Sequence, residues 1–362
     1  MRQTLAILLL APLLQAAPVG FASLDGGTTG GGDAKLVIVR TAKELQEAIE
    51  RLDVKDKKLR DSQPRVIQLA GDIDLGELAN QKPGNDLKKV GIIQPRSNTT
   101  LEGPPGGATI TAGTIELHGV ENVIIRNLRF RGLWEHDSSG EYDAMGWDYL
   151  RITSAGKTGS RHVWVDHCDF GKVYDGQLDV VHGSDLITIS HCIFSGGEEE
   201  QKKGLLFGHS SSDGARSLDK GHLNVTIHDC WFRGLTSRAP RLRTGNVHFL
   251  NNLVENTGTA TISVTGGATL VEGSVYKDCK EPTSFSHADD NVKKNRGGSI
   301  KIVDSLDLGE KSGERLANSP GEFRFNPPLG FAWPDLAKPP YDYKAKPVAD
   351  VAEIVKHNAG PH

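Results

Sequence analysis

The stretch HVWVDHCDF, residues 162–170, alternates apolar and polar side chains in a pattern that recurs along the centre of the chain. Its second and fourth residues, Val163 and Val165, are apolar. The corresponding residues are also apolar in four related stretches: NVIIRNLRF (122–130), LITISHCIF (186–194), NVTIHDCWF (224–232) and NVHFLNNLV (246–254). An apolar residue at every second position is typical of a β-strand with one buried face. The five stretches therefore predict five strands of one repeating unit.

The spacing of these stretches indicates how the strands are arranged. Successive starts lie 40, 24, 38 and 22 residues apart, and a weaker copy, ATLVEGSVY, starts 22 residues further on at position 268. A shortest period near 22, with longer intervals as insertions, is typical of a coil of parallel strands stacked at ~4.8 Å. We therefore predict an all-β fold, a right-handed parallel β-helix.

The same alignment places polar residues in one column and cysteines in the next. The polar column contains Asn127, His167, His191, Asp229 and Asn251, and the other contains Cys168, Cys192 and Cys230. Polar residues at a fixed turn can hydrogen-bond along the coil, so we expect a structural role for the two histidines. The cysteines lack CxxC spacing, which favours buried core thiols, with a disulfide or a metal site as the alternatives.

The two ends of a β-helix expose strand edges and core, and both need cover. Residues 41–53, TAKELQEAIERLD, begin with a capping box and carry an apolar stripe, which predicts a helix over the N-terminal end. Residues 348–360, VADVAEIVKHNAG, predict a second capping helix at the other end, after an extended strap. Residues 1–22 resemble a secretory signal cut near Ala22 and residues 23–34 a flexible lead-in, and we expect residues 35–362 to form a single β-helix domain.

Composition excludes several classes of partner. The formal net charge of −4 and the isoelectric point near 6.4 provide no basic field for nucleic acid. Beyond the N-terminal signal, no apolar run is long enough to span a bilayer. We therefore expect a secreted protein, extracellular or periplasmic, that is a monomer and binds neither nucleic acid nor membrane.

Charged residues follow three of the predicted strands at the same point of the coil. The segment after Phe170 carries Asp175 and Asp179, the segment after Phe194 carries Lys203, and the segment after Phe232 contains SRAPRLRTG (237–245). Consecutive turns of the coil therefore offer carboxylates, an ammonium and the guanidinium groups of three arginines, Arg238, Arg241 and Arg243. By the in-and-out alternation of its strand, Asp166 also faces outward, and we expect it to join this wall.

Three neighbouring carboxylates are either solvated at a turn or share a hard cation such as Ca²⁺. Beside a basic row, a Ca²⁺ site suits an elongated acidic polymer. Hydrolysis with Asp175 and Asp179 as acid and base is an alternative. Neighbouring cations argue against it, because they should lower the carboxyl pKa values. A non-catalytic binding module is a third possibility that composition does not separate from an enzyme.

Four blocks, in order, resemble a known family: WVDHCDF, YDGQLDVVHGSDLITIS, KKGLLFGHS and SRAPRLRTGNVHFLNN. They are similar to the signature blocks of the pectate lyases of polysaccharide lyase family 1, and the resemblance runs from about residue 35 to the C-terminal segment. It implies a right-handed parallel β-helix that cleaves polygalacturonate or low-methyl pectin by β-elimination, with Ca²⁺ as cofactor. Related pectin lyases, which act without Ca²⁺, are less similar because this chain keeps the DGxxD carboxylates.

The resemblance also implies roles for single residues. Asp166, Asp175 and Asp179 would be Ca²⁺ ligands, and Lys203 would contact a substrate carboxylate. Arg238 would be the catalytic base that removes the C5 proton, and Arg243 a substrate-binding arginine. Arg241 has no fixed role in this family, and we expect a surface or structural ion pair for it. Because a free arginine holds its proton to strongly alkaline pH, an alkaline optimum follows.

Overall fold

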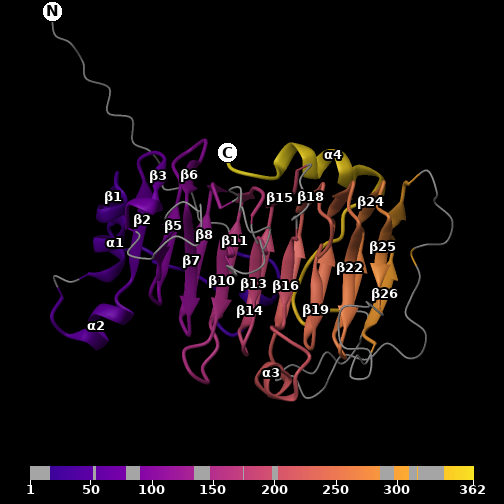
Figure 1. The fold of residues 1–362 in the computed structure, drawn as a ribbon, viewed down its shortest axis with the longest axis horizontal. Coiled ribbons are helices and arrows are strands. Elements are labelled where there is room, and N and C mark those ends of the chain that lie inside the picture. Colours follow the sequence, from indigo (N-terminus) through magenta and orange to yellow (C-terminus); the bar gives the residue numbers. More distant parts are fainter. Residues whose placement is uncertain are drawn as a thin grey trace, which may run out of the picture.

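A computed structural model describes residues 17–51, 54–78, 90–133, 147–173, 175–197, 203–285, 297–309, 316 and 338–362. Parallel strands coil around one long axis, so that each turn adds one strand to each of three sheets (Figure 1). Every pairing between the named strands is parallel, for example β11 with β8 and with β14. The prediction of a parallel β-helix is confirmed, and the predicted signal residues 1–16 lie outside the described residues.

The three sheets differ in the number of strands within the described ranges. Sheet A has ten strands: β1 (Leu36–Val39), β2 (Arg65–Leu69), β5 (Thr99–Glu102), β8 (Glu121–Arg126), β11 (Arg161–Asp166), β14 (Asp185–Ser190), β17 (Asn224–His228), β20 (Asn246–Leu250), β23 (Ala268–Glu272) and β26 (Ser299–Val303). Sheet B has nine: β3 (Ile73–Asp74), β6 (Ala108–Thr111), β9 (Leu128–Arg131), β12 (Asp169–Phe170), β15 (Ile193–Ser195), β18 (Trp231–Arg233), β21 (Leu253–Glu255), β24 (Val275–Lys277) and β27 (Leu306–Asp307). Sheet C has eight: β4 (Gly91–Ile93), β7 (Gly113–His118), β10 (Leu150–Thr153), β13 (Leu178–Val180), β16 (Leu205–Phe207), β19 (Arg241–Arg243), β22 (Thr259–Val264) and β25 (Glu281–Ser284).

The five repeated stretches form neighbouring strands of sheet A in the predicted register. Val163 pairs with Val123 on one side and with Ile187 on the other, and the three side chains are fully buried. The phenylalanines that follow also stack: the ring of Phe170 lies 4.7 Å from that of Phe130 and 5.0 Å from that of Phe194. Repetition of one side chain at one position of each turn therefore builds the core as a set of ladders.

The polar column lies at the turn between sheets A and B. Its five members all have positive φ, between 48° and 58°: Asn127, His167, His191, Asp229 and Asn251. In the next column, the backbone N–H of Cys168 donates to the sulfur of Cys192, and that of Cys192 to the sulfur of Cys230. These cysteines are free and fully buried. The expected core thiols are confirmed.

The predicted N-terminal cap is α1 (Ala42–Glu50). The hydroxyl of Thr41 accepts a hydrogen bond from the backbone of Glu44 at 3.1 Å, as expected for a helix N-cap. The buried side chains of α1, Leu45 and Ile49, belong to the core cluster of the coil. Three other short helices are η2 (Leu75–Leu78), α2 (Lys57–Ser62) and α3 (Asp213–Asp219).

The C-terminal helix, α4 (Val348–Asn358), does not cover the far end of the coil as predicted. It lies along the side of the coil, against β21 and β24 of sheet B (Figure 1). Its buried residues Val351 and Val355 pack with Leu253 and Val275. The apolar stripe predicted the buried face of α4 correctly, but a stripe does not specify which surface it contacts.

The end of the predicted signal and the predicted lead-in, residues 23–34, both lie against sheet A. Phe21, in η1 (Phe21–Ser23), is fully buried beside Tyr341 of the C-terminal strap. The backbone N–H groups of Phe21 and Gly31 donate to the hydroxyls of Thr226 and Thr100. A signal cut after Ala22 would remove the buried Phe21 from this surface. No helix among the described residues is long and apolar enough to cross a membrane.

Candidate active site

The charged segments predicted to share one part of the coil do lie together. They connect strands of sheet B to strands of sheet C on consecutive turns. Oδ1 of Asp175 lies 3.6 Å from the ammonium of Lys203 and 3.8 Å from a guanidinium nitrogen of Arg238. Lys203 also pairs by a parallel bridge with Ser237, the residue before Arg238. Carboxylate, ammonium and guanidinium therefore meet at one edge of sheet C.

The carboxylates of Asp148 and Asp179 lie beside this cluster, and Asp148 is not among the residues predicted from the sequence. Asp148 precedes β10, and its Oδ1 accepts a hydrogen bond from the backbone of Gly176 at 2.9 Å. A Cβ atom placed on Gly176 would lie 2.9 Å from Oδ1 of Asp148 and 3.0 Å from Oδ1 of Asp179. The two carboxylates therefore face one small space that only a glycine leaves open.

Sequence reasoning missed Asp148 because the aligned stretches cover strands of sheets A and B and none of sheet C. Leu150 pairs with Leu178 across β10 and β13, so Asp148 and Gly176 hold equivalent positions on adjacent turns. Extending the alignment to the apolar alternation of Leu150 and Ile152 would have placed an aspartate beside the DGxxD block. We name the set Asp148, Asp175, Asp179, Lys203, Arg238 and Arg243 the charged face.

The two buried carboxyls of the charged face hold their protons more tightly than usual. Burial raises the pKa of Asp179 to about 7; Arg238, Arg151 and Arg243 oppose this rise, and the Asp175 charge adds to it. Burial and the charges of Asp179 and Asp175 also raise the pKa of Asp148 well above its ordinary value. Two carboxylates in one buried space repel each other unless a proton or another cation lies between them.

These carboxyls fit a hard divalent cation. Oδ1 of Asp179 is buried and has no hydrogen-bond partner within the described part of the chain. Asp148, Asp175 and Asp179 together provide only oxygen donors, the ligand type that Ca²⁺ prefers. A buried carboxylate oxygen that lacks a donor among the described residues, in a space kept open by Gly176, fits a cation. The site therefore suits Ca²⁺, with Asp148 in the place predicted for Asp166.

Arg238 is held by its backbone as well as by its charge. It has φ of 71°, and its carbonyl accepts a 2.7 Å hydrogen bond from the backbone of Leu205. A Cβ on Gly204 would lie 2.2 Å from that carbonyl, so the glycine allows the close approach. The Ala239–Pro240 peptide bond that follows is cis. The Arg238 side chain is only 14% exposed, so its guanidinium is confined beside Asp175.

The other two arginines of this segment lie on β19 and differ in exposure. A guanidinium nitrogen of Arg243 donates to the carbonyls of Gly208 and His209, at 3.1 and 3.2 Å. This leaves Arg243 partly exposed at the other end of β19 from Arg238. Arg241 is 2% exposed, which contradicts a surface ion pair, while the alternative of a structural ion pair stays a prediction. It lies beside Leu206 and Ile262 in the sheet, on the face opposite the inward-pointing Leu242.

Arg151 of β10 is a further residue that the sequence did not single out. It pairs in register with Asp179. Its Nε is buried without a hydrogen-bond partner among the described residues. Its positive charge opposes the rise that burial causes in the pKa of Asp148 and of Asp179. Burial lowers the pKa of His182 and of His209, and the charge of Arg151 lowers both further. The guanidinium of Arg151 therefore extends the positive potential of the charged face toward Arg243.

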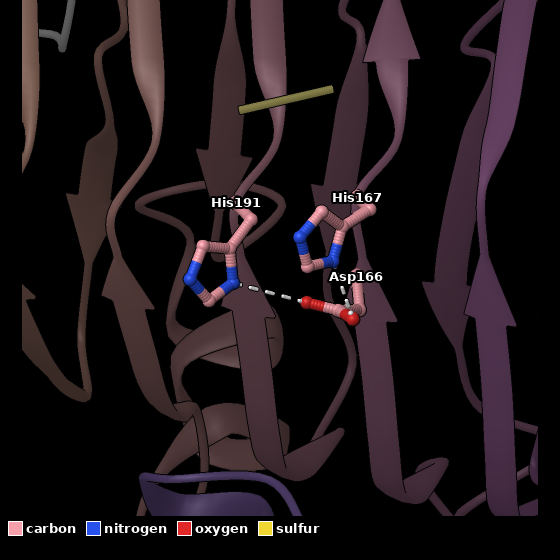
Figure 2. Close-up of side chains that lie close together, drawn as sticks. All are labelled: Asp166, His167 and His191. Carbon is pink, nitrogen blue, oxygen red and sulfur yellow. Dashed lines mark hydrogen bonds and ion pairs between the residues drawn. The ribbon is translucent and has the colours of Figure 1, made fainter. Parts of the chain in front are cut away.

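Asp166 does not join the charged face, which corrects the prediction. It ends β11 in sheet A, whereas the other predicted residues border sheet C. Its carboxylate contacts His167 Nδ1 at 2.7 Å and His191 Nδ1 at 3.3 Å (Figure 2). The alternation of side chains along a strand separates inward-facing from outward-facing residues, but a coil with three sheets has three outward faces. Asp166 faces outward from sheet A, not from sheet C.

The reason given against hydrolysis also needs correction. Neighbouring cations were expected to lower the carboxyl pKa values, yet burial outweighs Arg238, Arg151 and Arg243, and the pKa of Asp179 rises to about 7. A carboxyl that is protonated at neutral pH can act as a general acid. Its pKa alone therefore does not separate elimination from hydrolysis.

Comparison with known sequences identifies relatives over most of the chain. A family model described as "Pectate lyase" matches residues 2–305. Pectate lyase E of Dickeya chrysanthemi is 35% identical over 259 residues, which cover 66% of this chain and 62% of the relative. Pectate lyase A of the same organism is 30% identical over 96% of this chain and 89% of its own length. The chain thus spans less than two thirds of the first of these relatives and most of the second.

Solved structures agree on the fold. A pectate lyase from Paenibacillus sp. 0602 superposes with a TM-score of 0.76 at 24% identity, covering 95% of this chain and 96% of its own. A pectate lyase from Bacillus sp. N165, solved in complex with trigalacturonate, superposes with a TM-score of 0.70 at 22% identity, covering 95% and 98%. At these identities the likeness supports the shared β-helix.

Proposed function

Because this chain belongs to the pectate lyase family, we propose that it is a Ca²⁺-dependent pectate lyase that cleaves α-1,4-linked polygalacturonate by β-elimination. One observation supports this most strongly. The buried carboxyls of Asp148 and Asp179 face one space, and Asp175 beside them contacts both Lys203 and Arg238. An acidic pocket directly beside a basic row suits a polymer with one carboxylate per sugar.

Substrate binding falls to the cationic side chains of the charged face. Lys203 offers an ammonium as a point charge for a uronate carboxylate. Arg243, which uses one nitrogen for the carbonyls of Gly208 and His209, can direct other N–H groups to a second carboxylate. The trigalacturonate complex of the Bacillus sp. N165 enzyme is consistent with an oligogalacturonate ligand.

Asp148, Asp175 and Asp179 would hold the Ca²⁺. When bound, the ion would neutralise the uronate carboxylate and so acidify the adjacent C5–H bond. The three aspartates would then be ionised together, because the cation would offset both the burial and the repulsion between carboxylates that raise the pKa of Asp148 and of Asp179. Asp175 would keep its ion pairs with Lys203 and Arg238, and so orient both side chains toward the same substrate unit.

Arg238 would accept the C5 proton in its neutral form. The electron pair of the C5–H bond forms the C4–C5 double bond, and the bond from C4 to the glycosidic oxygen breaks. The oxygen leaves with its electron pair and takes a proton from water. Because a free arginine is deprotonated only at strongly alkaline pH, activity should rise with pH in the alkaline range.

We also propose that the protein is secreted and works as a monomer. The apolar N-terminal stretch of residues 1–22 supports secretion. Because Phe21 is fully buried, we place the signal cut before Gly20 rather than after Ala22. N-terminal sequencing of protein from a secreting host tests this, and a mature chain that starts after Ala22 would contradict it.

Absorbance in the ultraviolet tests the proposed reaction. Elimination leaves a 4,5-unsaturated sugar that absorbs, so polygalacturonate incubated with the protein and CaCl₂ should gain absorbance, and EDTA should stop the gain. New reducing ends without absorbance would instead identify a hydrolase. Turnover of fully methylated pectin that resists EDTA would identify a pectin lyase. Polymer binding with neither signal would identify a binding module.

A further inference from the structure

Asp166, His167 and His191 form a second cluster of polar side chains, which we name the histidine cluster. Figure 2 shows the imidazole rings of His167 and His191 side by side, with the carboxylate of Asp166 at their edge and a nitrogen of each ring directed toward it. One ligand atom from each residue can be chosen so that all three lie within 4.8 Å of one another. The cluster belongs to the turn between sheets A and B, on a different face from the charged face.

The donor set has the composition of a transition-metal site. Two imidazole nitrogens and one carboxylate oxygen are ligands for Zn²⁺ and its neighbours, and each would lie roughly 2.0–2.2 Å from the ion. The 3.3 Å between Oδ1 of Asp166 and Nδ1 of His191 is a spacing that two ligands of one such ion can adopt. The 2.7 Å between Oδ2 of Asp166 and Nδ1 of His167 would lengthen as an ion replaced the shared proton.

The groups around the histidine cluster are those that orient metal ligands. The hydroxyl of Ser190 donates to Oδ1 of Asp166 at 2.5 Å, and Trp164 donates to that hydroxyl at 2.8 Å. The second nitrogen of His191, Nε2, lies 3.7 Å from a carboxylate oxygen of Asp229. A metal-binding histidine usually directs its other nitrogen to a carboxylate in this way.

The cluster is open on one side. A cavity of about 460 Å³ is lined by Asp166 and His167 together with Asn127, Arg126 and Glu102. This cavity gives an ion a path of entry and leaves room for water as a fourth ligand. Arg126, which lines this cavity, is paired with Glu102 at 2.5 Å, so its charge is already compensated.

The other members of the polar column show that the turn does not need a histidine at this position. Asn127 and Asn251 occupy the same position as His167 and His191 on other turns, with the same positive φ. An asparagine amide is therefore sufficient to support this turn. Two imidazoles on adjacent turns, both directed at one carboxylate, add the means to bind an ion. We propose that Asp166, His167 and His191 bind a divalent transition-metal ion of the zinc class.

The proposal goes beyond the lyase activity and does not rest on it, and zinc binding tests it directly. Untagged protein is stripped with EDTA, supplied with excess CaCl₂ to occupy the charged face, and titrated with ZnCl₂ by calorimetry. We expect one zinc ion per chain. His167→Asn and His191→Asn should each weaken binding by about tenfold or more, since each removes one ligand. Asparagine keeps the residue type that the column already uses, so the fold should survive.

Two variants serve as controls. His357→Asn removes an exposed histidine of α4, and Asp179→Asn removes a carboxylate of the charged face; both should bind zinc as the parent chain does. X-ray absorption at the zinc edge of the parent protein should show imidazole scattering, which needs no variant. Absence of zinc binding, equal binding by His167→Asn and the parent, or a spectrum without imidazole would overturn the proposal.

Discussion

The charged face and the histidine cluster both contain buried aspartates, and their carboxyl groups have opposite properties. Burial dominates at Asp179 and raises its pKa to about 7. Burial also opposes the charge of Asp166, but hydrogen bonds from His167, His191 and Ser190 outweigh it and hold the pKa of Asp166 below its ordinary value. Asp229 has a pKa lowered to about 2, because His228 and Lys346 outweigh its burial. The difference shows that neighbours, not burial alone, decide whether a buried aspartate is charged.

The two clusters differ in whether their buried aspartates need an added cation. Asp166 already has donors for its charge, so it supports the turn without any added ligand. Asp148 and Asp179 repel each other and have an oxygen without a donor among the described residues, so they need a proton or a cation. Uncompensated buried carboxyls are expected where a cation binds, whereas hydrogen bonds already compensate the carboxylate of Asp166.

The largest effect should come from the base of the charged face. Arg238→Lys should lower turnover of polygalacturonate by about 10²–10⁴-fold, because lysine does not reproduce the position of the guanidinium nitrogens. The melting temperature should stay unchanged. Arg233→Lys, an exposed arginine of β18 over Trp231, is the matched control and should keep full activity. Full activity of folded Arg238→Lys would remove Arg238 from the mechanism.

The second prediction compares how Asp166 and Asp179 contribute to the free energy of unfolding. In EDTA at pH 8, Asp166→Asn should lower the free energy of unfolding by about 2–4 kcal/mol, since the histidines and Ser190 lose their charged acceptor. Asp179→Asn should leave this free energy unchanged or raise it, because it removes an uncompensated buried charge. Urea unfolding of both variants measures the contrast. Equal losses in the two would contradict the distinction between the clusters.

The third prediction concerns pH. The pKa of Asp179 is higher in the folded than in the unfolded protein, so its contribution to stability falls as pH rises from about 4 to about 7, by a few kcal/mol at most. The pKa of Asp229 is lower in the folded protein, so its contribution is present above pH 4 and is lost toward pH 2. Melting temperatures in EDTA across this range should show a decline at both ends.

Ca²⁺ and the Asp179→Asn variant identify the source of the upper decline. Either should flatten the fall in melting temperature between pH 4 and pH 7, and neither should alter the fall below pH 4. Because protons and Ca²⁺ compete for the same carboxylates, Ca²⁺ should raise the melting temperature more at pH 8 than at pH 5. A rise that is the same at both pH values would place the ion elsewhere.

The smallest effect should come from Arg151, which lies beside Asp179 without closing the site. Arg151→Gln removes a positive charge that opposes a second cation, so Ca²⁺ should bind about 3- to 10-fold more tightly. Calorimetric titration with CaCl₂ measures this change. Lys172→Gln, a lysine outside the charged face, is the control for the overall loss of charge and should leave Ca²⁺ affinity unchanged. Weaker binding in Arg151→Gln would show that Arg151 instead orients the carboxylates.

The sequence placed five charged residues on one part of the coil, and it failed at two aspartates for two different reasons. Asp175, Asp179, Lys203, Arg238 and Arg243 could be placed together because each follows the same strand of the repeat by a similar interval. Asp166 was misplaced because the alternation of side chains distinguishes only inward from outward, whereas the coil has three outward faces, one for each sheet. Asp148 was missed because the repeated stretches end before sheet C, so that none of them includes β10, the strand that follows Asp148.

By itself, the sequence determined the repeat: the alternation around Val163, the recurring phenylalanines and the column that begins at Asn127 require parallel strands that stack side chain on like side chain. These features repeat along the chain at short intervals, and such a repeat can be recognised from the sequence alone. Only the tertiary structure decided which outward face each charge occupies, that α4 lies along sheet B, and that Phe21 is buried under the strap. Those facts depend on how far the chain turns between strands, which no single segment encodes.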